Sequence, residues 1–491
     1  MKRNYLAFDL GASSGRAIVC RLENGHLSLT EVHRFVNGPV ERGGALFWDF
    51  PALCAEIKEG LKKALAVEPG ISGIAIDTWG VDYVLYSRAT GQPLRLPYNY
   101  RDTRTLETPA KIFKSISKED IYARTGIQFM NINTLYQLAA HREQHPEDFE
   151  NSVLLFIPDA LTNYLNGEFT CEYTIASTSN LLDPNTRDWD FELIDKLGIP
   201  RSIFPEIVMP STVSAPLRPE LQKELGCGPI PLIRVGAHDT ASAVGAVPAA
   251  PDSNWAYISC GTWALLGAEI DRPLMTPAAE AAPCTNEGGL AGKIRFLTNI
   301  MGTWLFQETR RNWRAEGKEM SFARMEELAA AAEPWKFLIN PNDGLFLGPN
   351  DMPGRIRRYC AEHGQGEPAT DGEILRCVYD SLALCFREKL EKLENILNVR
   401  YQFLNIVGGG TQDHRLMQYT ADALGIPVTA GPIEATAIGN AISQAIALGD
   451  VAGLNEGRRI VRDSFEVIEF KPAASRKDWD SAMTRFNQLA L

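Results

Sequence analysis

The chain has 491 residues, a length at which one hydrophobic core no longer grows, so two large domains are expected. Its apolar fraction of 45% and charged fraction of 22% are those of an ordinary globular protein, which excludes fibrous and disordered classes. The formal net charge of −12, without a long Lys/Arg run, argues against nucleic acid as a partner.

The cysteines and the apolar runs indicate the compartment. The nine cysteines are scattered and no Cys-x-x-Cys pair occurs, which argues against a disulfide framework and against a zinc site. Buried free thiols are therefore expected, as in a reducing compartment. The sequence starts without an apolar signal segment, and no apolar run reaches the ~18 residues that span a bilayer. These features predict a cytoplasmic protein that does not insert into a membrane.

The first hundred residues predict strands around one helix. Strands are expected at 5–10, 17–22, 27–35, 71–77 and 83–86, and a helix at 51–66, where large aliphatic residues recur every four positions. Three antiparallel strands, a helix and further strands follow the order of a ribonuclease-H-like sheet, as in actin-like folds. The α/β class is therefore predicted.

The rest of the chain divides at a predicted hinge. Residues 105–230 indicate a helical, loop-rich insertion, and the Pro/Ala-rich stretch 246–252 predicts the boundary between domains 1–245 and 246–491. A second hairpin at 255–268 is similar in shape to the first, which indicates an old duplication. The remaining predicted elements are a strand at 232–236, a helix at 376–395, a strand at 403–407 and a helix at 412–424.

Three glycine-bearing turns follow apolar strands. They are Asp9-Leu-Gly-Ala-Ser-Ser-Gly-Arg16, Ser259-Cys-Gly-Thr-Trp263 and Val407-Gly-Gly-Gly-Thr-Gln412. Such turns direct backbone N–H groups and small hydroxyls toward one point, as an oxyanion requires, so two of them can hold one polyphosphate. Each alone is also typical of an ordinary bend. The P-loop and the Rossmann fingerprint are both absent.

Polar residues also stand where predicted strands end. Asp9, Asp77 and Asp239 are expected to converge, because ligands of open α/β sheets collect at that edge. Taken singly, Asp239 is typical of a helix N-cap, Asp9 of a turn, and His238 of a structural histidine. Together they offer a base and a carboxylate that holds Mg²⁺ through water, which is most of what phosphoryl transfer requires.

The ordered motifs resemble the FGGY carbohydrate kinases from residue 5 to about residue 470. Besides the three turns, the resemblance is carried by Asp77-Thr-Trp-Gly-Val-Asp82, Tyr100-Arg-Asp-Thr-Arg104, His238-Asp-Thr240, Thr285-Asn-Glu-Gly-Gly289, Asn299-Ile-Met-Gly302, Ile339-Asn-Pro-Asn-Asp343 and Gly431-Pro-Ile-Glu-Ala-Thr436. The Phe-Gly-Gly-Tyr string that names the family is absent from this sequence.

The resemblance implies two actin-like domains with an active-site cleft between them, the sugar mainly on the first and ATP mainly on the second. It implies ATP-dependent phosphorylation of the C1 hydroxyl of a ketose, L-rhamnulose, with Mg²⁺ as cofactor. Kinases of L-fuculose, L-xylulose or L-ribulose, and a non-catalytic ATP or sugar sensor, are alternatives. A sensor needs no base, so the presence of Asp239 with Asp9 and Thr262 argues against it. Monomer and dimer both stay open.

The resemblance also implies roles for individual residues. Asp239 would be the general base, and Asp9 would hold Mg²⁺ through water. Sugar specificity is expected on the first domain; the ketose contacts would be Gly80, His238, Asp239, Thr240 and Asn299. The nucleotide contacts would be Ala12, Ser13, Ser14, Gly15, Arg16, Thr262, Gln307 and Gly409, with Gly409 beside the adenosine.

Overall fold

The computed structural model describes every residue except Met1, Asp252, Ala490 and Leu491. The chain forms two compact units that are not continuous in sequence. Unit 1 consists of Met1–Ala250, Glu269–Phe296 and Glu434–Phe465, and unit 2 of Pro251–Ala268, Leu297–Ile433 and Glu466–Leu491. The first change of unit falls inside the predicted hinge, of which Asp252 lies outside the described residues. A cut at 245/246 divides the sequence but does not account for the two later segments that pack in unit 1.

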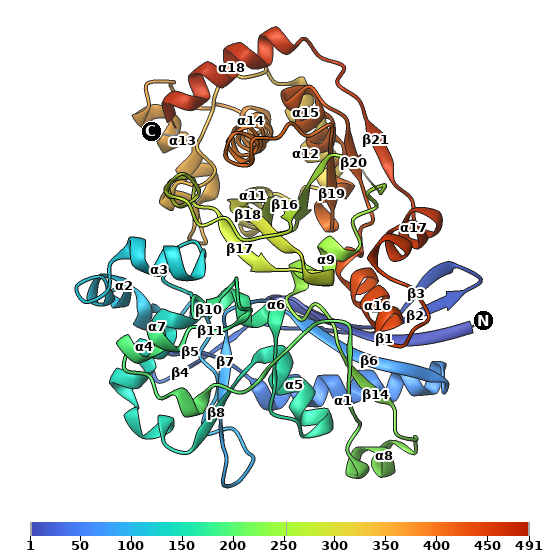
Figure 1. Ribbon diagram of the computed structural model, residues 1–491. Coiled ribbons are helices and arrows are strands. Elements are labelled where there is room, and N and C mark those ends of the chain that lie inside the picture. Colours follow the sequence, from blue (N-terminus) through green and yellow to red (C-terminus); the bar gives the residue numbers. More distant parts are fainter. Residues whose placement is uncertain (1, 252, 490–491) are drawn as a thin grey trace. The chain divides into compact units, whose positions relative to one another are not determined.

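A six-stranded sheet in the order β13-β14-β6-β1-β2-β3 forms the centre of unit 1 (Figure 1). Strands β1, β2 and β3 are antiparallel, whereas β6 runs parallel to β1 and β14 parallel to β6. The bounds are β1 Lys2–Leu10, β2 Ser14–Glu23, β3 His26–Val36, β6 Ile71–Thr78, β13 Thr212–Pro216 and β14 Pro231–Arg234. The predicted meander and the ribonuclease-H-like order are confirmed.

Helix α1, Phe50–Val67, forms where a helix is predicted, and it packs against this sheet. The Asp49 carboxylate caps it by accepting a hydrogen bond from the Ala52 amide at 3.2 Å, and Pro51 stands in the first turn, where no N–H partner is needed. Leu53, Ile57 and Leu61 are buried along one face. The four-residue spacing therefore predicts the helix and the face that it buries.

The remaining elements of unit 1 are short, as expected for the insertion. The helices are α2 Thr108–Ile112, α3 Lys118–Thr125, α4 Thr134–Gln144, α5 Ile157–Asn166, α6 Tyr173–Ala176, α7 Phe191–Lys196, α8 Pro219–Leu225, α9 Asp239–Gly245, α10 Pro277–Ala281, α16 Ala435–Ala447 and α17 Leu454–Ser464. The strands are β4 Pro39–Arg42, β5 Ala45–Trp48, β7 Tyr83–Ser87, β8 Ser152–Phe156, β9 Cys171–Glu172, β10 Leu182–Asp183, β11 Asp188–Trp189, β12 Ile207–Val208 and β17 Thr285–Gly288.

Helix α16, drawn in red in Figure 1, packs against α9 and β1 although it lies near the end of the sequence. A Cβ atom at Gly439 would stand 1.7 Å from the carbonyl oxygen of Ser242, so only glycine permits this helix crossing. The Asn440 amide donates to Asp77 at 2.6 Å, and the Gln444 amide donates to the Leu6 carbonyl at 3.1 Å. These contacts make α16 part of the core of unit 1.

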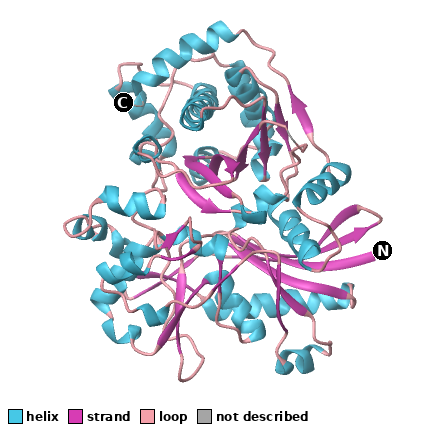
Figure 2. Cartoon of the chain, in the orientation of Figure 1, coloured by secondary structure: helices cyan, strands magenta, loops and turns pink. Residues whose placement is uncertain are grey.

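The second sheet has the strand order β17-β18-β16-β15-β19-β20-β21, of which the strands from β18 onward lie wholly or partly in unit 2, and helices gather around them (Figure 2). The strands are β15 Trp255–Cys260, β16 Trp263–Ile270, β18 Ile294–Met301, β19 Phe403–Val407, β20 Val428–Ala430 and β21 Ile468–Phe470. The helices are α11 Trp304–Ala315, α12 Phe322–Ala331, α13 Met352–Glu362, α14 Asp371–Leu397, α15 His414–Leu424 and α18 Arg476–Leu489. The predicted second hairpin is confirmed.

Two predicted helices have different ends in the structure. Helix α14 begins five residues earlier than expected, because Thr370 and Glu373 form a capping box. Helix α15 begins at His414 with Asp413 as its N-cap, and residues 409–412 form a short 3₁₀ turn. The cysteines are free thiols, and only Cys227 among them is half-buried rather than buried. Of the helices formed by the described residues, none has the length and apolar character needed to cross a bilayer.

Candidate active site

Three aspartates meet at one edge of the unit 1 sheet. Asp9 and Asp77 are register partners on the parallel strands β1 and β6, and Asp239 begins α9 directly after His238, which bridges Thr78. Burial raises the pKa of Asp9, Arg16 opposes that shift, and the charge of Asp239 adds to it. Burial and then Asp9 raise the pKa of Asp77 well above its ordinary value. The predicted convergence is therefore present in the structure.

The first glycine turn joins β1 to β2. The Gly11 amide donates to the Ser14 carbonyl at 2.9 Å, and the Asn37 side-chain amide donates to the Gly11 carbonyl at 2.8 Å. A Cβ atom at Gly15 would stand 2.1 Å from the Phe35 ring, so no side chain fits there. Ala12, Ser13 and Ser14 thus lie in a turn whose backbone is fixed from two sides. No local sequence pattern predicts that Asn37 supports this turn.

Arg16, at the end of this turn, forms two ion pairs. Its guanidinium contacts the carboxylates of both Asp9 and Glu434. Asp9 and Arg16 are cross-strand partners in the β1–β2 hairpin, whereas Glu434 precedes α16. Asp9 is consequently a strand carboxylate paired with Arg16, and its alternative interpretation as a turn residue is wrong.

His238, Asp239 and Gly80 lie together. His238 Nε2 is 3.4 Å from Asp239 Oδ1, and a Cβ atom at Gly80 would stand 3.5 Å from the same nitrogen. Asp239 Oδ1 accepts hydrogen bonds from the Thr240 amide at 2.5 Å and from the Thr240 hydroxyl at 3.1 Å. The N-cap position of α9 belongs to His238, so the N-cap interpretation of Asp239 is wrong. The Asp239 side chain is 30% exposed, which leaves it open to a ligand.

The buried residue Asp82 supports the backbone around Gly80. Its buried carboxylate accepts hydrogen bonds from the indole nitrogens of Trp48 at 2.6 Å and Trp79 at 3.0 Å, and from the Gln137 amide at 2.8 Å. Burial raises its pKa to about 6. Because Trp79 precedes Gly80, this anchoring fixes the backbone that faces His238. Asp82 ends the Asp77–Asp82 motif of the sequence, but no local sequence pattern predicts the residues that it contacts.

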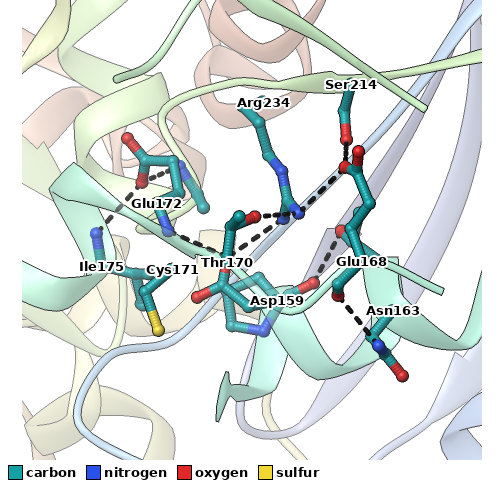
Figure 3. A network of polar contacts seen from close by, with 12 residues as sticks. Asp159, Asn163, Glu168, Thr170, Cys171, Glu172, Ile175, Ser214 and Arg234 are labelled. Carbon is teal, nitrogen blue, oxygen red and sulfur yellow. Dashed lines mark hydrogen bonds and ion pairs between the residues drawn. The ribbon is translucent and has the colours of Figure 1, made fainter. Parts of the chain in front are cut away.

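A buried polar network around Glu172, part of which is drawn in Figure 3, holds the strand end that delivers His238. Glu172 Oε2 accepts hydrogen bonds from the Ile175 amide and the Ala237 amide, each at 3.1 Å. The His238 amide donates to the Thr174 hydroxyl at 3.2 Å. Burial raises the pKa of Glu172 to about 7. These hydrogen bonds fix the backbone amides of Ala237 and His238, the two residues before Asp239.

The same network continues to β14. Asp159 Oδ1 accepts hydrogen bonds from the Glu172 amide at 3.0 Å and from Arg234 at 3.2 Å, and Arg234 donates to the Thr170 hydroxyl at 2.6 Å (Figure 3). Burial raises the pKa of Asp159 to about 8. β14 and the turn after it are therefore tied to β9 and α5 by charged and polar groups.

In unit 2 the second glycine turn joins β15 to β16 and carries Thr262. The Thr262 hydroxyl lies 3.5 Å from the Gln307 side-chain oxygen, and Gln307 Nε2 donates to the Thr303 hydroxyl at 2.9 Å. The Thr262 carbonyl accepts from the Gly302 amide at 3.1 Å. Thr262 and Gln307, predicted from distant parts of the sequence, are thus neighbours.

The third glycine turn lies beside this hairpin, since β19 runs parallel to β15 with Val407 opposite Ser259. A Cβ atom at Gly410 would stand 2.3 Å from the Cys260 sulfur, and Gly408 has a φ of 93°. A Cβ atom at Gly409 meets nothing within 4 Å among the described residues. Two glycines therefore permit close packing and positive φ, while the middle one faces open space.

Asn299 is located differently from the expectation. It is half-buried on β18 and belongs to unit 2, together with Thr262, Gln307 and Gly409. The expectation that the sugar contacts lie on the first domain is therefore wrong for Asn299, because β18 starts in unit 1 and continues into unit 2.

The residues of the aspartate edge fit a Mg²⁺ ion held through water. The donors are hard carboxylate oxygens, and Asp77 Oδ1 is buried without a hydrogen-bond partner among the described residues. Within the described part of the chain, no three His, Cys, Asp or Glu side chains are placed to hold a metal together.

Comparison with known proteins connects both units to one family. The N-terminal domain of the FGGY family of carbohydrate kinases matches residues 4–245, and the C-terminal domain of that family matches residues 256–448. A rhamnulokinase of Bacteroides thetaiotaomicron is 43% identical over 487 residues, covering 99% of each chain. A rhamnulokinase of Halalkalibacterium halodurans is 41% identical over 474 residues, which is 96% of this chain and 99% of the relative.

Solved structures share the fold at low identity. The gluconate kinase of Lactobacillus acidophilus superposes with a TM-score of 0.82 at 16% identity, covering 100% of this chain and 97% of the other. The glycerol kinase of Plasmodium falciparum gives 0.80 at 17% identity, covering 99% and 97%. The predicted two-domain α/β fold is confirmed by these superpositions.

Proposed function

Because the chain belongs to the FGGY family of carbohydrate kinases, we propose that it transfers the γ-phosphoryl group of ATP to the C1 hydroxyl of L-rhamnulose. The choice of sugar is supported by rhamnulokinases that are 43% and 41% identical over nearly the whole chain. The chemistry is supported by one observation above all, the partly exposed carboxylate of Asp239 at an edge where Asp9 and Asp77 are buried.

Asp239 is the general base of this proposal. Its Oδ1 is occupied by the amide and hydroxyl of Thr240, which leaves Oδ2 for the proton of the ketose hydroxyl. Asp9 and Asp77 lie at the same edge of the sheet, and burial raises the pKa of both carboxyl groups. Gly80 and His238 form the adjoining contact surface for the sugar, and Asn299 is a further proposed contact from unit 2.

The nucleotide is proposed to be held by the glycine turns. Residues 12–16 offer backbone N–H groups and two serine hydroxyls, while Thr262 and Gln307 offer neutral donors, and the open backbone at Gly409 suits the adenosine. Mg²⁺, when bound, neutralises charge on the phosphates. Asp9 orients its water ligands, and Arg16 fixes Asp9 for that role. We also propose a domain boundary between residues 245 and 246 and a cytoplasmic location for the protein.

A panel of ketoses tests the function. L-Rhamnulose, L-fuculose, L-xylulose and L-ribulose are supplied with ATP and Mg²⁺, and the product is located by ³¹P and ¹³C NMR. L-Rhamnulose should have the highest kcat/KM and give the 1-phosphate. A higher kcat/KM for another ketose would transfer the proposal to that sister substrate. Tight ATP binding without turnover on any sugar would favour the sensor.

A further inference from the structure

The side of the His238 ring away from Asp239 faces two charged residues. Arg295 Nη2 lies 3.0 Å from His238 Nδ1, and Glu287 Oε2 lies 3.2 Å from the same nitrogen. Arg295 is 0% exposed and Glu287 7% exposed. Glu287 belongs to the Thr285–Gly289 motif, to which the proposed reaction gives no role. The three residues belong to unit 1.

Two contacts hold the Arg295 guanidinium beside the His238 ring. Its Nε donates to the Gly288 carbonyl at 2.8 Å, and its Nη2 is paired with Glu287 Oε2 at 2.9 Å. Burial raises the pKa of Glu287, but the charge of Arg295 and the contact with His238 outweigh it, and the net pKa is below the ordinary value. Glu287 is therefore ionised and keeps the guanidinium in place.

A guanidinium carries N–H donors and no acceptor. The hydrogen bond between Arg295 and Nδ1 consequently requires a lone pair on Nδ1. In the neutral ring the single proton must then be on Nε2, the nitrogen that faces Gly80 and Asp239. The opposite tautomer would place the Nδ1 proton against an N–H of Arg295.

We propose that Arg295 and Glu287 are positioning residues that fix His238 as the Nε2-protonated tautomer, so that His238 recognises the ketose only as a hydrogen-bond donor. The group that it contacts is then a hydroxyl or carbonyl oxygen acting as acceptor. The statement about the ketose rests on the proposed function. The statement about the tautomer does not, and it can be measured without any substrate.

The tautomer is read directly by ¹⁵N NMR. The full-length protein is prepared with ring-¹⁵N histidine, and long-range ¹H–¹⁵N spectra distinguish the two tautomers and the imidazolium. The chain has seven histidines, and the His238 signals are identified by their loss in His238→Gln. A protonated Nε2 with an unprotonated Nδ1 is expected near pH 8. A protonated Nδ1, in either the other tautomer or the imidazolium, overturns the proposal.

Two variants of Arg295 separate positioning from stability. Arg295→Met removes the donor, so the proton should move to Nδ1 and face Glu287, and the ketose KM should rise about tenfold while the ATP KM stays within about twofold. Arg295→Lys keeps a cationic donor and should retain the wild-type tautomer. An unchanged tautomer in Arg295→Met overturns the proposal. If that variant does not fold, the wild-type spectrum alone decides. Absence of turnover on L-rhamnulose, with the expected tautomer present, rejects only the proposed substrate.

Discussion

The two units use the same local architecture with different chemistry. In each, a hairpin with a glycine turn runs beside a parallel strand, β1–β2 beside β6 in unit 1 and β15–β16 beside β19 in unit 2. The register places Asp9 opposite Asp77 in the first case and Ser259 opposite Val407 in the second. The backbone geometry is repeated, but at these register positions only the unit 1 copy carries acids.

The two units differ in the charge of the polar groups at these sheet edges. The unit 1 edge concentrates three carboxylates, whose burial and mutual repulsion raise the pKa of Asp9 and Asp77. The unit 2 edge offers hydroxyl and amide groups in Thr262, Thr303 and Gln307. Acid–base work and metal binding are therefore expected to depend on unit 1, and neutral contacts with the nucleotide on unit 2. Each of the following predictions tests that division.

The largest effect is expected for Asp239→Asn. The amide cannot take a proton, so kcat should fall by about 10²–10⁴-fold while ketose binding, measured by calorimetry, is retained. Asp120→Asn, at an exposed position of α3, is the matched control and should keep the wild-type rate. A rate for Asp239→Asn within about tenfold of wild type would remove Asp239 from the role of base.

Asp9→Asn should change the dependence of the rate on Mg²⁺ concentration. Because Asp9 is proposed to orient metal-bound water, its loss should raise the Mg²⁺ concentration for half-maximal rate by about 10- to 100-fold. The titration is performed at saturating ketose and ATP, and saturating Mg²⁺ should restore part of the rate. Equal Mg²⁺ dependence in the variant and the wild type would show that the metal is held elsewhere.

A crossed pair of variants compares the two units directly. Thr262→Val keeps the shape of the side chain and removes its hydroxyl, so the ATP KM should rise about tenfold with little change for the ketose. His238→Ala should do the reverse. Both KM values are measured for each variant. If either variant raises both constants equally, its residue acts through folding rather than through one substrate.

The smallest effect is on the pH dependence of stability. The folded-state pKa of Glu172 is about 7 against an ordinary 4.5, so between these values the folded chain binds more protons than the unfolded one. Stability therefore falls as pH rises through this window, and the full cost is present above pH 7. Glu172→Gln should gain melting temperature relative to wild type at pH 8 but not at pH 4.5. The exposed control Glu150→Gln should show no such change, and a parallel pH response of Glu172→Gln and wild type would contradict the prediction.

The sequence predicts most strands, the hairpins and the meeting of the three aspartates. Alternating burial and glycine turns are local signals, and the carboxyl ends of parallel strands share an edge, so these features need no distant partner. The roles of Thr262 and Gln307 came from resemblance, and the structure makes them neighbours, although 45 positions separate them.

Other parts of the site could not be predicted. Arg16 contacts Glu434 and Asp77 contacts Asn440, pairs separated by 418 and 363 positions, which no local pattern specifies. Glu172 and Arg295 are charged residues with no exposure, against the ordinary preference of charge for the surface. Their burial depends on partners that come together only in the folded chain.

The packing of α16 against α9 and β1 has a consequence for synthesis. The ribosome makes Leu6 and Asp77 early, but their partners Gln444 and Asn440 follow several hundred codons later. Until then the sheet of unit 1 lacks one covering helix, so the part of the chain that emerges first is completed almost last. A nascent chain stalled before residue 434 should accordingly be far more sensitive to protease across residues 1–250 than a chain released in full.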